Sequence, residues 1–242
     1  MSRWKCASLW ARFPWLLCYA WLLCSGVSLA AQAATGAVSA VSAAEPTAAS
    51  VTQRVDAHYD HLRSLRARFT EQYTGMGMER DEAGTLLLER ASVTGAGRMR
   101  WDYSEPAGKY FLIDGRYAYF YAPGDEQVVR MKASELDDLR SPLRFLLGHT
   151  KFSSELTGLR MTAAGADFVL TGVPRGAEKR VAEVALRVTA AGEIRSMTIR
   201  ELDGSVTRFR LSDEVDDPAI ASASFRFHAP EGVAVTDGLP PA

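Results

Sequence analysis

The chain has 242 residues, and its 28 basic and 29 acidic residues give a net charge of −1. This balance excludes the basic footprint that a nucleic-acid-binding protein needs. Beyond the first fifty residues, roughly 190 residues remain, a length that suits one domain with a sizeable hydrophobic core.

The N-terminus has the three parts of a signal peptide. Its only charges before residue 45 are basic, an uncharged apolar run covers residues 13–34, and Ala31-Gln32-Ala33 forms a small-x-small cleavage site. An uncleaved transmembrane anchor is the alternative, because the run is nearly long enough to span a bilayer. The alanines and serines at its end are more typical of a peptidase site. We therefore expect residues 1–33 to be a cleaved leader and the mature protein to be exported.

All three cysteines lie in this leader, at Cys6, Cys18 and Cys24. The last two follow Leu-Leu, whereas lipidation needs a small residue before the cysteine. We therefore expect a mature chain without a stable membrane anchor or a disulfide, whose stability comes from its core. Without the leader's three basic residues, 25 basic and 29 acidic residues remain, a net charge of −4.

A linker and then a helix follow the leader. Residues 34–50 are rich in Ala, Ser and Thr, a composition typical of a flexible linker. We place one domain over residues 51–242. Apolar residues at steps of four or three predict that it opens with a helix. These residues are Val51, Val55, Tyr59, Leu62 and Leu65.

Short strands separated by turns dominate the rest of the chain. Asp114-Gly115 between two apolar runs is a strong hairpin signal. Two short helices are expected in the middle, over 133–140 and 142–147, with Ser141 capping the second. Strands are expected at 67–73, 84–89, 99–103, 109–113, 117–121, 127–131, 156–162, 167–171, 181–189, 194–201, 206–212 and 225–227.

The order of these elements predicts an up-and-down antiparallel sheet that curls toward a barrel. Two or three helices are too few to cover both faces of such a sheet, so we expect them to fill or cover its concave side. A lining of aromatic and aliphatic side chains there is the usual composition of a site for apolar ligands.

Catalytic signatures are absent from the sequence: it contains no HExxH, no GxSxG, no P-loop and no GxGxxG that opens a helix. We therefore expect no enzyme, no cofactor and no metal. His58 and His61 could share a metal on the first helix, but we interpret them as surface histidines because no third ligand is evident. The side chains of the adjacent pairs Asp137-Asp138 and Asp216-Asp217 should diverge, and we interpret them as solvated loop or helix-cap carboxylates.

Eight short motifs follow one another along the mature chain. They are ARFTEQ (67–72), GTLLLER (84–90), MRWDYSEP (99–106), LIDG (112–115), YFYAPGDEQV (119–128), SPLRFLLG (141–148), DGSVTRF (203–209) and FRFHAPEGVAV (225–235). In this order, which covers nearly the whole mature domain, they resemble the periplasmic outer-membrane lipoprotein carrier family, called LolA-like.

This resemblance implies a mainly β (α+β) fold: an unclosed antiparallel barrel of about ten or eleven strands with an α-helical lid. It implies a cavity for the acyl chains of lipoproteins. It also implies two partners for a monomeric periplasmic shuttle, namely an inner-membrane lipoprotein-releasing ABC transporter and an outer-membrane lipoprotein acceptor.

The resemblance also implies a latch, an arginine at the end of the second strand that holds the lid by hydrogen bonds to backbone carbonyls. The matching position is Arg90. The proline that usually follows is replaced by Ala91, and residues 92–97 resemble an insertion. This departure makes Arg98 and Arg100 alternates, and a solvated arginine at a strand end is the structural alternative.

Alternation along the strands predicts the lining of the cavity. Met99, Trp101 and Tyr103 share one face of their strand, while Arg100 and Asp102 share the other. Ordinary core packing is the alternative interpretation for each residue. The full predicted lining is Phe69, Tyr73, Leu86, Leu88, Met99, Trp101, Tyr103, Phe111, Ile113, Tyr119 and Tyr121, with Leu143, Leu146 and Leu147 from the lid.

Three other functions fit parts of the sequence. The same half-barrel can serve as a lipid- or lipoprotein-sensing regulatory domain, although such sensors usually carry a second domain. A periplasmic hydrolase with a dispersed site is a second alternative. An outer-membrane barrel needs outward apolar faces on every strand, and the charged run Glu79-Arg80-Asp81-Glu82 argues against it.

Overall fold

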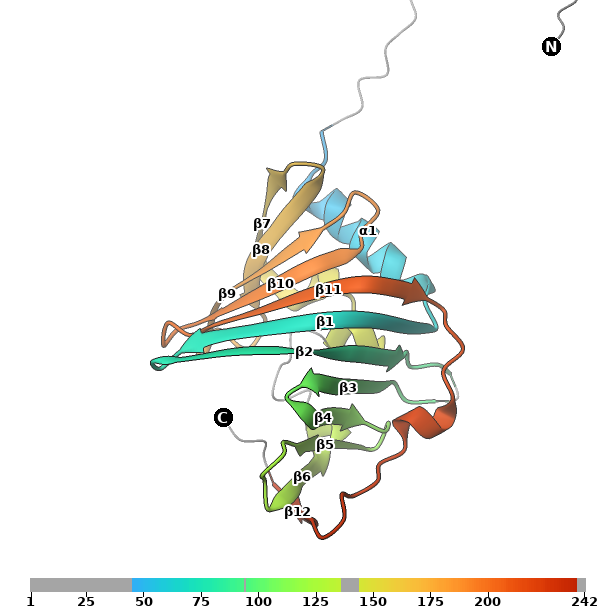
Figure 1. Ribbon diagram of the computed structural model, residues 1–242. Helices are drawn as coiled ribbons and strands as arrows, with labels where there is room; N and C mark the ends of the chain where they lie inside the picture. Colours follow the sequence, from blue (N-terminus) through green and yellow to red (C-terminus); the bar gives the residue numbers. More distant parts are fainter. Residues whose placement is uncertain (1–44, 94, 136–143, 239–242) are drawn as a thin grey trace, which may run out of the picture. The chain divides into compact units, whose positions relative to one another are not determined.

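One antiparallel sheet organises the chain (Figure 1). The computed structural model describes residues 45–93, 95–135 and 144–238. The described strands are β1 (Ser64–Gly75), β2 (Met78–Glu89), β3 (Arg98–Glu105), β4 (Ala107–Ile113), β5 (Tyr117–Tyr121), β6 (Gln127–Lys132), β7 (Leu156–Ala164), β8 (Asp167–Pro174), β9 (Val181–Val188), β10 (Ile194–Glu201), β11 (Val206–Asp216) and β12 (Ala234–Asp237).

The strand order is β12-β6-β5-β4-β3-β2-β1-β11-β10-β9-β8-β7. Consecutive strands pair as antiparallel hairpins within β1–β6 and within β7–β11, and β1 joins the two halves by pairing with both β2 and β11. Only the short β12 pairs in parallel, with β6. The sheet has two free edges, so the mainly β, unclosed antiparallel architecture that the sequence predicts is confirmed.

The described helical segments are α1 (Ala48–His61), η1 (Arg144–Leu147), α3 (Phe152–Glu155) and η2 (Ser222–Phe225). Among the described residues, no helix combines the length and the apolar character needed to cross a membrane. Of the two short helices expected in the middle, the structure describes a helical 133–135 and η1, while residues 136–143 lie outside the described part.

Helix α1 begins earlier and ends earlier than the hydrophobic pattern predicts. A capping box between Thr47 and Ser50 starts it, inside the range assigned to the linker. Leu65 belongs to β1, not to the helix. The reason is Asp217, whose Oδ1 accepts hydrogen bonds from the backbone N–H groups of Arg63 (2.7 Å) and Ser64 (3.2 Å) and so directs the chain into β1.

The C-terminal segment also differs from the expectation. The strand predicted over 225–227 is wrong, because Ser222–Phe225 form the 3₁₀ turn η2, which buries Phe225 against the sheet. Strand β12 was not predicted. Figure 1 shows the chain running from β11 past β3–β6 to reach β12.

Each face of the sheet carries its own hydrophobic cluster. We call the face that packs against α1, η1 and α3 the inner face; its buried residues include Phe69, Leu86 and Trp101, and Phe145 of η1 packs in the same cluster. The opposite, outer face has a smaller cluster of Leu112, Tyr119, Val128 and Phe225. The two clusters alternate along the same strands, as the two-residue period of a strand requires.

Candidate functional site

The inner face is lined by aromatic side chains in edge-to-face contact. The Phe69 ring lies 4.5 Å from that of Trp101 and 4.9 Å from that of Tyr103, and Trp101 lies 5.6 Å from Phe209. Gly84 makes room for this arrangement, because a Cβ there would lie 2.8 Å from the Phe69 ring. The lining therefore comes from β1, β2, β3 and β11 together.

Short helical segments cover this lining. Phe145 of η1 packs between Tyr59 of α1 (5.9 Å) and Phe152 of α3 (5.2 Å). Leu146 and Leu147 are buried in the same cluster. The cover is thus built from separate pieces of the chain, each of which contributes buried apolar side chains.

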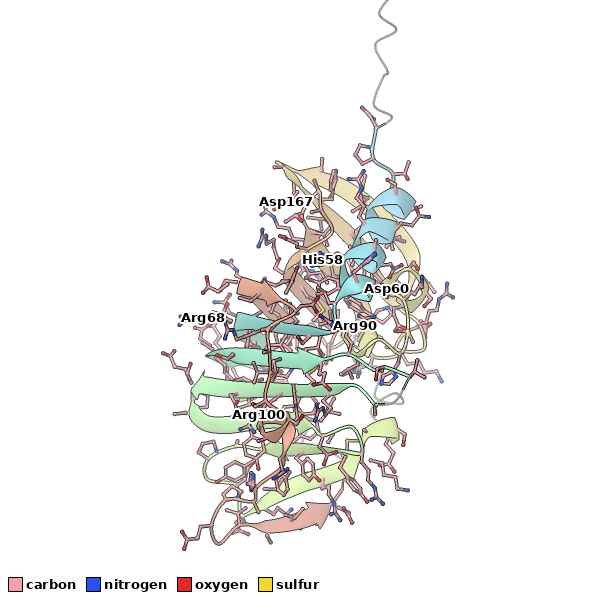
Figure 2. All side chains as sticks on the ribbon, turned by 90° about the vertical axis from the view of Figure 1, so that its right-hand side faces the viewer. His58, Asp60, Arg68, Arg90, Arg100 and Asp167 are labelled. Atoms are coloured by element: carbon pink, nitrogen blue, oxygen red, sulfur yellow. The ribbon has the colours of Figure 1, made fainter. Side chains whose placement is uncertain are left out.

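Arg90, at the end of β2, ties the cover to the sheet. Its Nη1 donates to the backbone carbonyls of Phe145 (3.2 Å) and Leu146 (3.3 Å), and its Nη2 donates to Asp60 Oδ1 on α1 (3.1 Å). The side chain is 9% exposed, and this burial lowers the pKa of the guanidinium although Asp60 opposes the shift. Figure 2 shows Arg90 and Asp60 side by side.

Two neighbouring residues adapt the chain to Arg90. Gly148 has φ +84°, and a Cβ there would lie 3.2 Å from the guanidinium, so both its conformation and the close approach favour glycine. The backbone N–H of Ala91 donates to the Leu147 carbonyl (2.9 Å). A proline at this position would lack that N–H, so Ala91 provides a hydrogen bond to the cover that proline could not make.

The alternates Arg98 and Arg100 lie on the outer face. Arg98 donates to Glu89 (2.6 Å) and lies 4.8 Å from the Phe225 ring. Arg100 donates to Asp102 (2.7 Å) and to the Ser224 carbonyl (3.1 Å). In the described part of the chain, the contacts with Phe225 and Ser224 connect these arginines to the C-terminal segment, and neither arginine contacts η1.

One end of the inner face is charged. Glu71 and Glu82 are directly opposed on β1 and β2, a pairing that is unfavourable unless other groups compensate it. Lys109 donates to Glu82 (2.5 Å) and Tyr103 OH donates to Glu71 (2.8 Å). Burial raises the pKa of the Glu71 carboxyl and of the Tyr103 hydroxyl.

A pocket of about 260 Å³ opens over this end of β1 and β2. Its lining is mostly charged or polar, which suits acyl chains poorly. We therefore place the candidate site in the apolar part of the inner face. The pocket is lined by Thr70, Glu71, Gln72, Asp81, Glu82, Ala83, Glu105 and Arg210.

Most of the predicted lining residues meet on the inner face. Tyr103 and Phe111 are partly buried against the cluster, and Tyr73 lies beyond it, under Arg80 at 4.8 Å. Leu143 lies outside the described residues. The residues buried in the inner cluster are Phe69, Leu86, Leu88, Met99, Trp101, Ile113, Leu146 and Leu147.

The prediction that Tyr119 and Tyr121 share this lining is wrong. Ile113 pairs with Ala118, so Ala118 and Phe120 share the inner face and the tyrosines point outward. Tyr119 stacks on Phe227 at 3.9 Å, and burial beside Asp114 raises its pKa to about 12. Alternation could not select the face here, because this strand has aromatic side chains on both.

Sequence reasoning also missed part of the lining. Phe120 stacks on Phe111 at 4.5 Å. The register across the Asp114-Gly115 turn could have identified it, because it places Phe120 directly opposite Phe111. The other half of the sheet contributes buried residues that the motifs did not point to. These are Leu170, Val184, Leu186, Val188, Ile194 and Met197.

The interpretation of His58 as a surface histidine is wrong. Its side chain is 15% exposed, and its Nε2 lies 3.3 Å from Glu214 Oε1 on β11. This hydrogen bond raises the pKa of the imidazole, although burial opposes the shift. His61, in contrast, is exposed and bonds to the Ala57 carbonyl in its own helix.

Comparison with known proteins finds relatives of this chain. Outer-membrane lipoprotein carrier proteins of Pectobacterium carotovorum and Cronobacter sakazakii are 27% and 28% identical to the chain over 192 and 180 residues. The matches span 78% and 74% of the chain, and 89% and 83% of those proteins. A crystal structure of a LolA superfamily protein from Nitrosomonas europaea has a TM-score of 0.40 and 14% identity, covering 75% of this chain and 98% of that one.

The family model of the outer membrane lipoprotein carrier protein LolA matches residues 60–228, well over half of the sequence. The matched range begins in α1 and ends after η2, so it includes both faces of the sheet and the cover with Arg90. This chain therefore belongs to the LolA family of outer membrane lipoprotein carrier proteins.

Proposed function

We propose that this protein is a non-enzymatic periplasmic carrier that holds the acyl chains of lipoproteins on its inner face and shuttles them to the outer membrane. The observation that supports this most directly is an apolar face whose helical cover is tied by one arginine through backbone carbonyls. The family membership and the names of the relatives point to the same function.

The energetics of acyl chains explain why such a carrier needs a large apolar face. Each buried methylene contributes about 0.8 kcal/mol. A chain of about 15 methylenes therefore gains on the order of 12 kcal/mol when it leaves water. Acyl chains that replace the contacts of Phe145 and Leu146 with the sheet would keep the lining buried while the cover moves.

In this proposal Arg90 is the latch that sets the balance between the covered and the open inner face. A ligand that displaces η1 must break the bonds from Arg90 to the Phe145 and Leu146 carbonyls and the bond from Ala91. The partners that would drive this exchange are an inner-membrane releasing transporter and a lipidated acceptor at the outer membrane. The leader over residues 1–33 would deliver a monomeric protein to the compartment between them.

The test compares two adjacent residues on opposite faces of β5. Phe120→Ser removes an aromatic ring from the inner face and Tyr121→Ser removes one from the outer face. We expect wild-type protein purified from the periplasm to carry lipoprotein or diacyl lipid in native mass spectrometry and to release lipoproteins from spheroplasts. Phe120→Ser should lose most of this release, and Tyr121→Ser should retain it.

Urea unfolding of both variants shows whether each is folded at the assay temperature. A folded Phe120→Ser protein that releases lipoproteins as well as wild type would contradict the placement of the site. A wild-type protein that carries no lipid and releases no lipoprotein would contradict the carrier function itself.

A further inference from the structure

His58 meets two carboxylates at the contact between α1 and β11. Glu214 and Asp216 are two residues apart on β11, so their side chains share the face that packs against the helix. One ligand atom from each of the three residues lies within 4.8 Å of the others. The His58 Nε2 to Glu214 Oε1 distance is 3.3 Å.

These carboxylates lack the permanent cation that balances others in the structure. Glu82, Glu89 and Asp237 each bind a lysine or an arginine. Glu214 is 9% exposed, and its described partners are His58 and the hydroxyl of Tyr59 (3.5 Å).

Asp216 increases this imbalance, because its side chain makes no hydrogen bond or ion pair with the described part of the chain. Glu193 also lies near His58, but Arg195 pairs with it at 2.8 Å. When the imidazole is neutral, Glu214 and Asp216 therefore have no cationic partner in the described part of the chain, and the nitrogen that faces Glu214 is Nε2.

We propose that His58, Glu214 and Asp216 bind a divalent transition metal ion of the Zn²⁺ type. Zn²⁺ binds imidazole nitrogen and carboxylate oxygen at about 2.0–2.2 Å, so two tetrahedral ligands lie about 3.3–3.5 Å apart. The His58–Glu214 distance already has this value. Asp216 is exposed, which leaves the fourth position open to water.

Such a metal would join α1 directly to the sheet. Tyr59, the next residue of the helix, accepts a hydrogen bond from the Ile194 backbone N–H (3.0 Å) and packs on Phe145 of the cover. The metal would therefore fasten the helix next to the inner face, at a place separate from Arg90.

The test uses tag-free mature protein, because an affinity tag would itself bind metal. We expect isothermal titration with Zn²⁺ to show one ion per chain, and Co²⁺ to give the visible absorption bands of a tetrahedral site. His58→Gln should abolish this binding. Asp216→Asn should weaken it by at least about tenfold, the loss that removing an outer-shell partner already causes. Asp216 is exposed, so this variant is expected to fold normally.

The matched control is His61→Gln, on the same helix but outside the cluster. It should bind Zn²⁺ with wild-type affinity. Absence of Zn²⁺ binding in the wild type would overturn the proposal. Binding that survives both His58→Gln and Asp216→Asn, or that is lost in His61→Gln, would also overturn it.

Discussion

The two faces of the sheet are covered in different ways. On the outer face, residues 217–233 are held by large side chains of the cover itself: Phe225 is 2% exposed and Phe227 stacks on Tyr119. On the inner face, two backbone carbonyls of η1 accept hydrogen bonds from one buried side chain, Arg90, whereas on the outer face Arg100 reaches a single carbonyl, that of Ser224. Apolar contacts can be replaced by a ligand's acyl chains, whereas a polar tie has to be broken. In the proposed carrier function, the inner cover is the one that opens, once the bonds from Arg90 break and acyl chains replace the contacts of Phe145 and Leu146, while the outer cover stays in place.

The largest effect is expected for Phe225→Ala, which removes the main buried side chain of the outer cover. Removing a fully buried phenylalanine leaves a cavity and typically costs about 3–5 kcal/mol. We expect the free energy of unfolding in urea to fall by this amount. The adjacent and exposed Arg226→Ala is the control and should change little. A loss below about 1 kcal/mol for Phe225→Ala would mean that the outer cover is held as loosely as the inner one.

A moderate effect is expected for Arg90→Leu. Hydrogen bonds that involve a charged group contribute about 1.5–3 kcal/mol each when buried, so the covered state should lose stability locally. We expect faster amide exchange over residues 145–148. We also expect Arg90→Leu to release lipoproteins from spheroplasts normally but to transfer them poorly to the outer-membrane acceptor, because the hydrogen bonds that re-form the cover are missing.

Arg100→Leu is the matched variant on the outer face. It loses a bond to the Ser224 carbonyl, yet Phe225 should keep that segment protected from exchange. Equal loss of protection around 224 in this variant would contradict the distinction between the two covers. Normal hand-over by Arg90→Leu would instead contradict the role of Arg90.

The smallest effect concerns Glu71, at the charged end of the inner face. Its folded-state pKa is raised above the ordinary 4.5, mainly by burial. Glu71 therefore contributes stability that is complete below pH 4.5 and is lost as the pH rises through the folded-state pKa. Glu71→Gln should flatten this part of the stability curve measured in urea, whereas Glu79→Gln, exposed on β2, should not. A curve of unchanged slope in Glu71→Gln would show that the inner face is open to water there.

The local sequence pattern predicts which side chains face inward wherever one side of a strand is apolar and the other is polar. Met99 and Trp101 alternate with Arg100 and Asp102, and their inner-face placement follows from that alone. The antiparallel sheet and the Asp114-Gly115 hairpin are confirmed for the same reason: tight turns and two-residue periodicity are local properties.

Contacts between distant segments determine the placement of residues that the hydrophobic pattern assigned wrongly. Leu65 continues the helical spacing of α1, but Asp217, far along the chain, pulls the backbone into β1. Phe225 lies in a short stretch that the sequence predicts as a strand, but it ends a 3₁₀ turn and anchors the C-terminal segment by its buried ring. His58 acquires its carboxylate neighbours only because β11 passes beside α1. Each of these contacts joins segments far apart in the sequence, where single-sequence periodicity carries no information.

The two free edges of the sheet bear on how readily the protein pairs with a second copy of itself. Exposed strand edges invite pairing with a second chain. Strand β12 covers four residues of β6 and leaves an edge only four residues long. At the other edge, β7 carries a register shift between Thr157 and Arg160, and such irregularities disrupt further pairing. The unclosed barrel thus has protection against edge-to-edge aggregation at both ends.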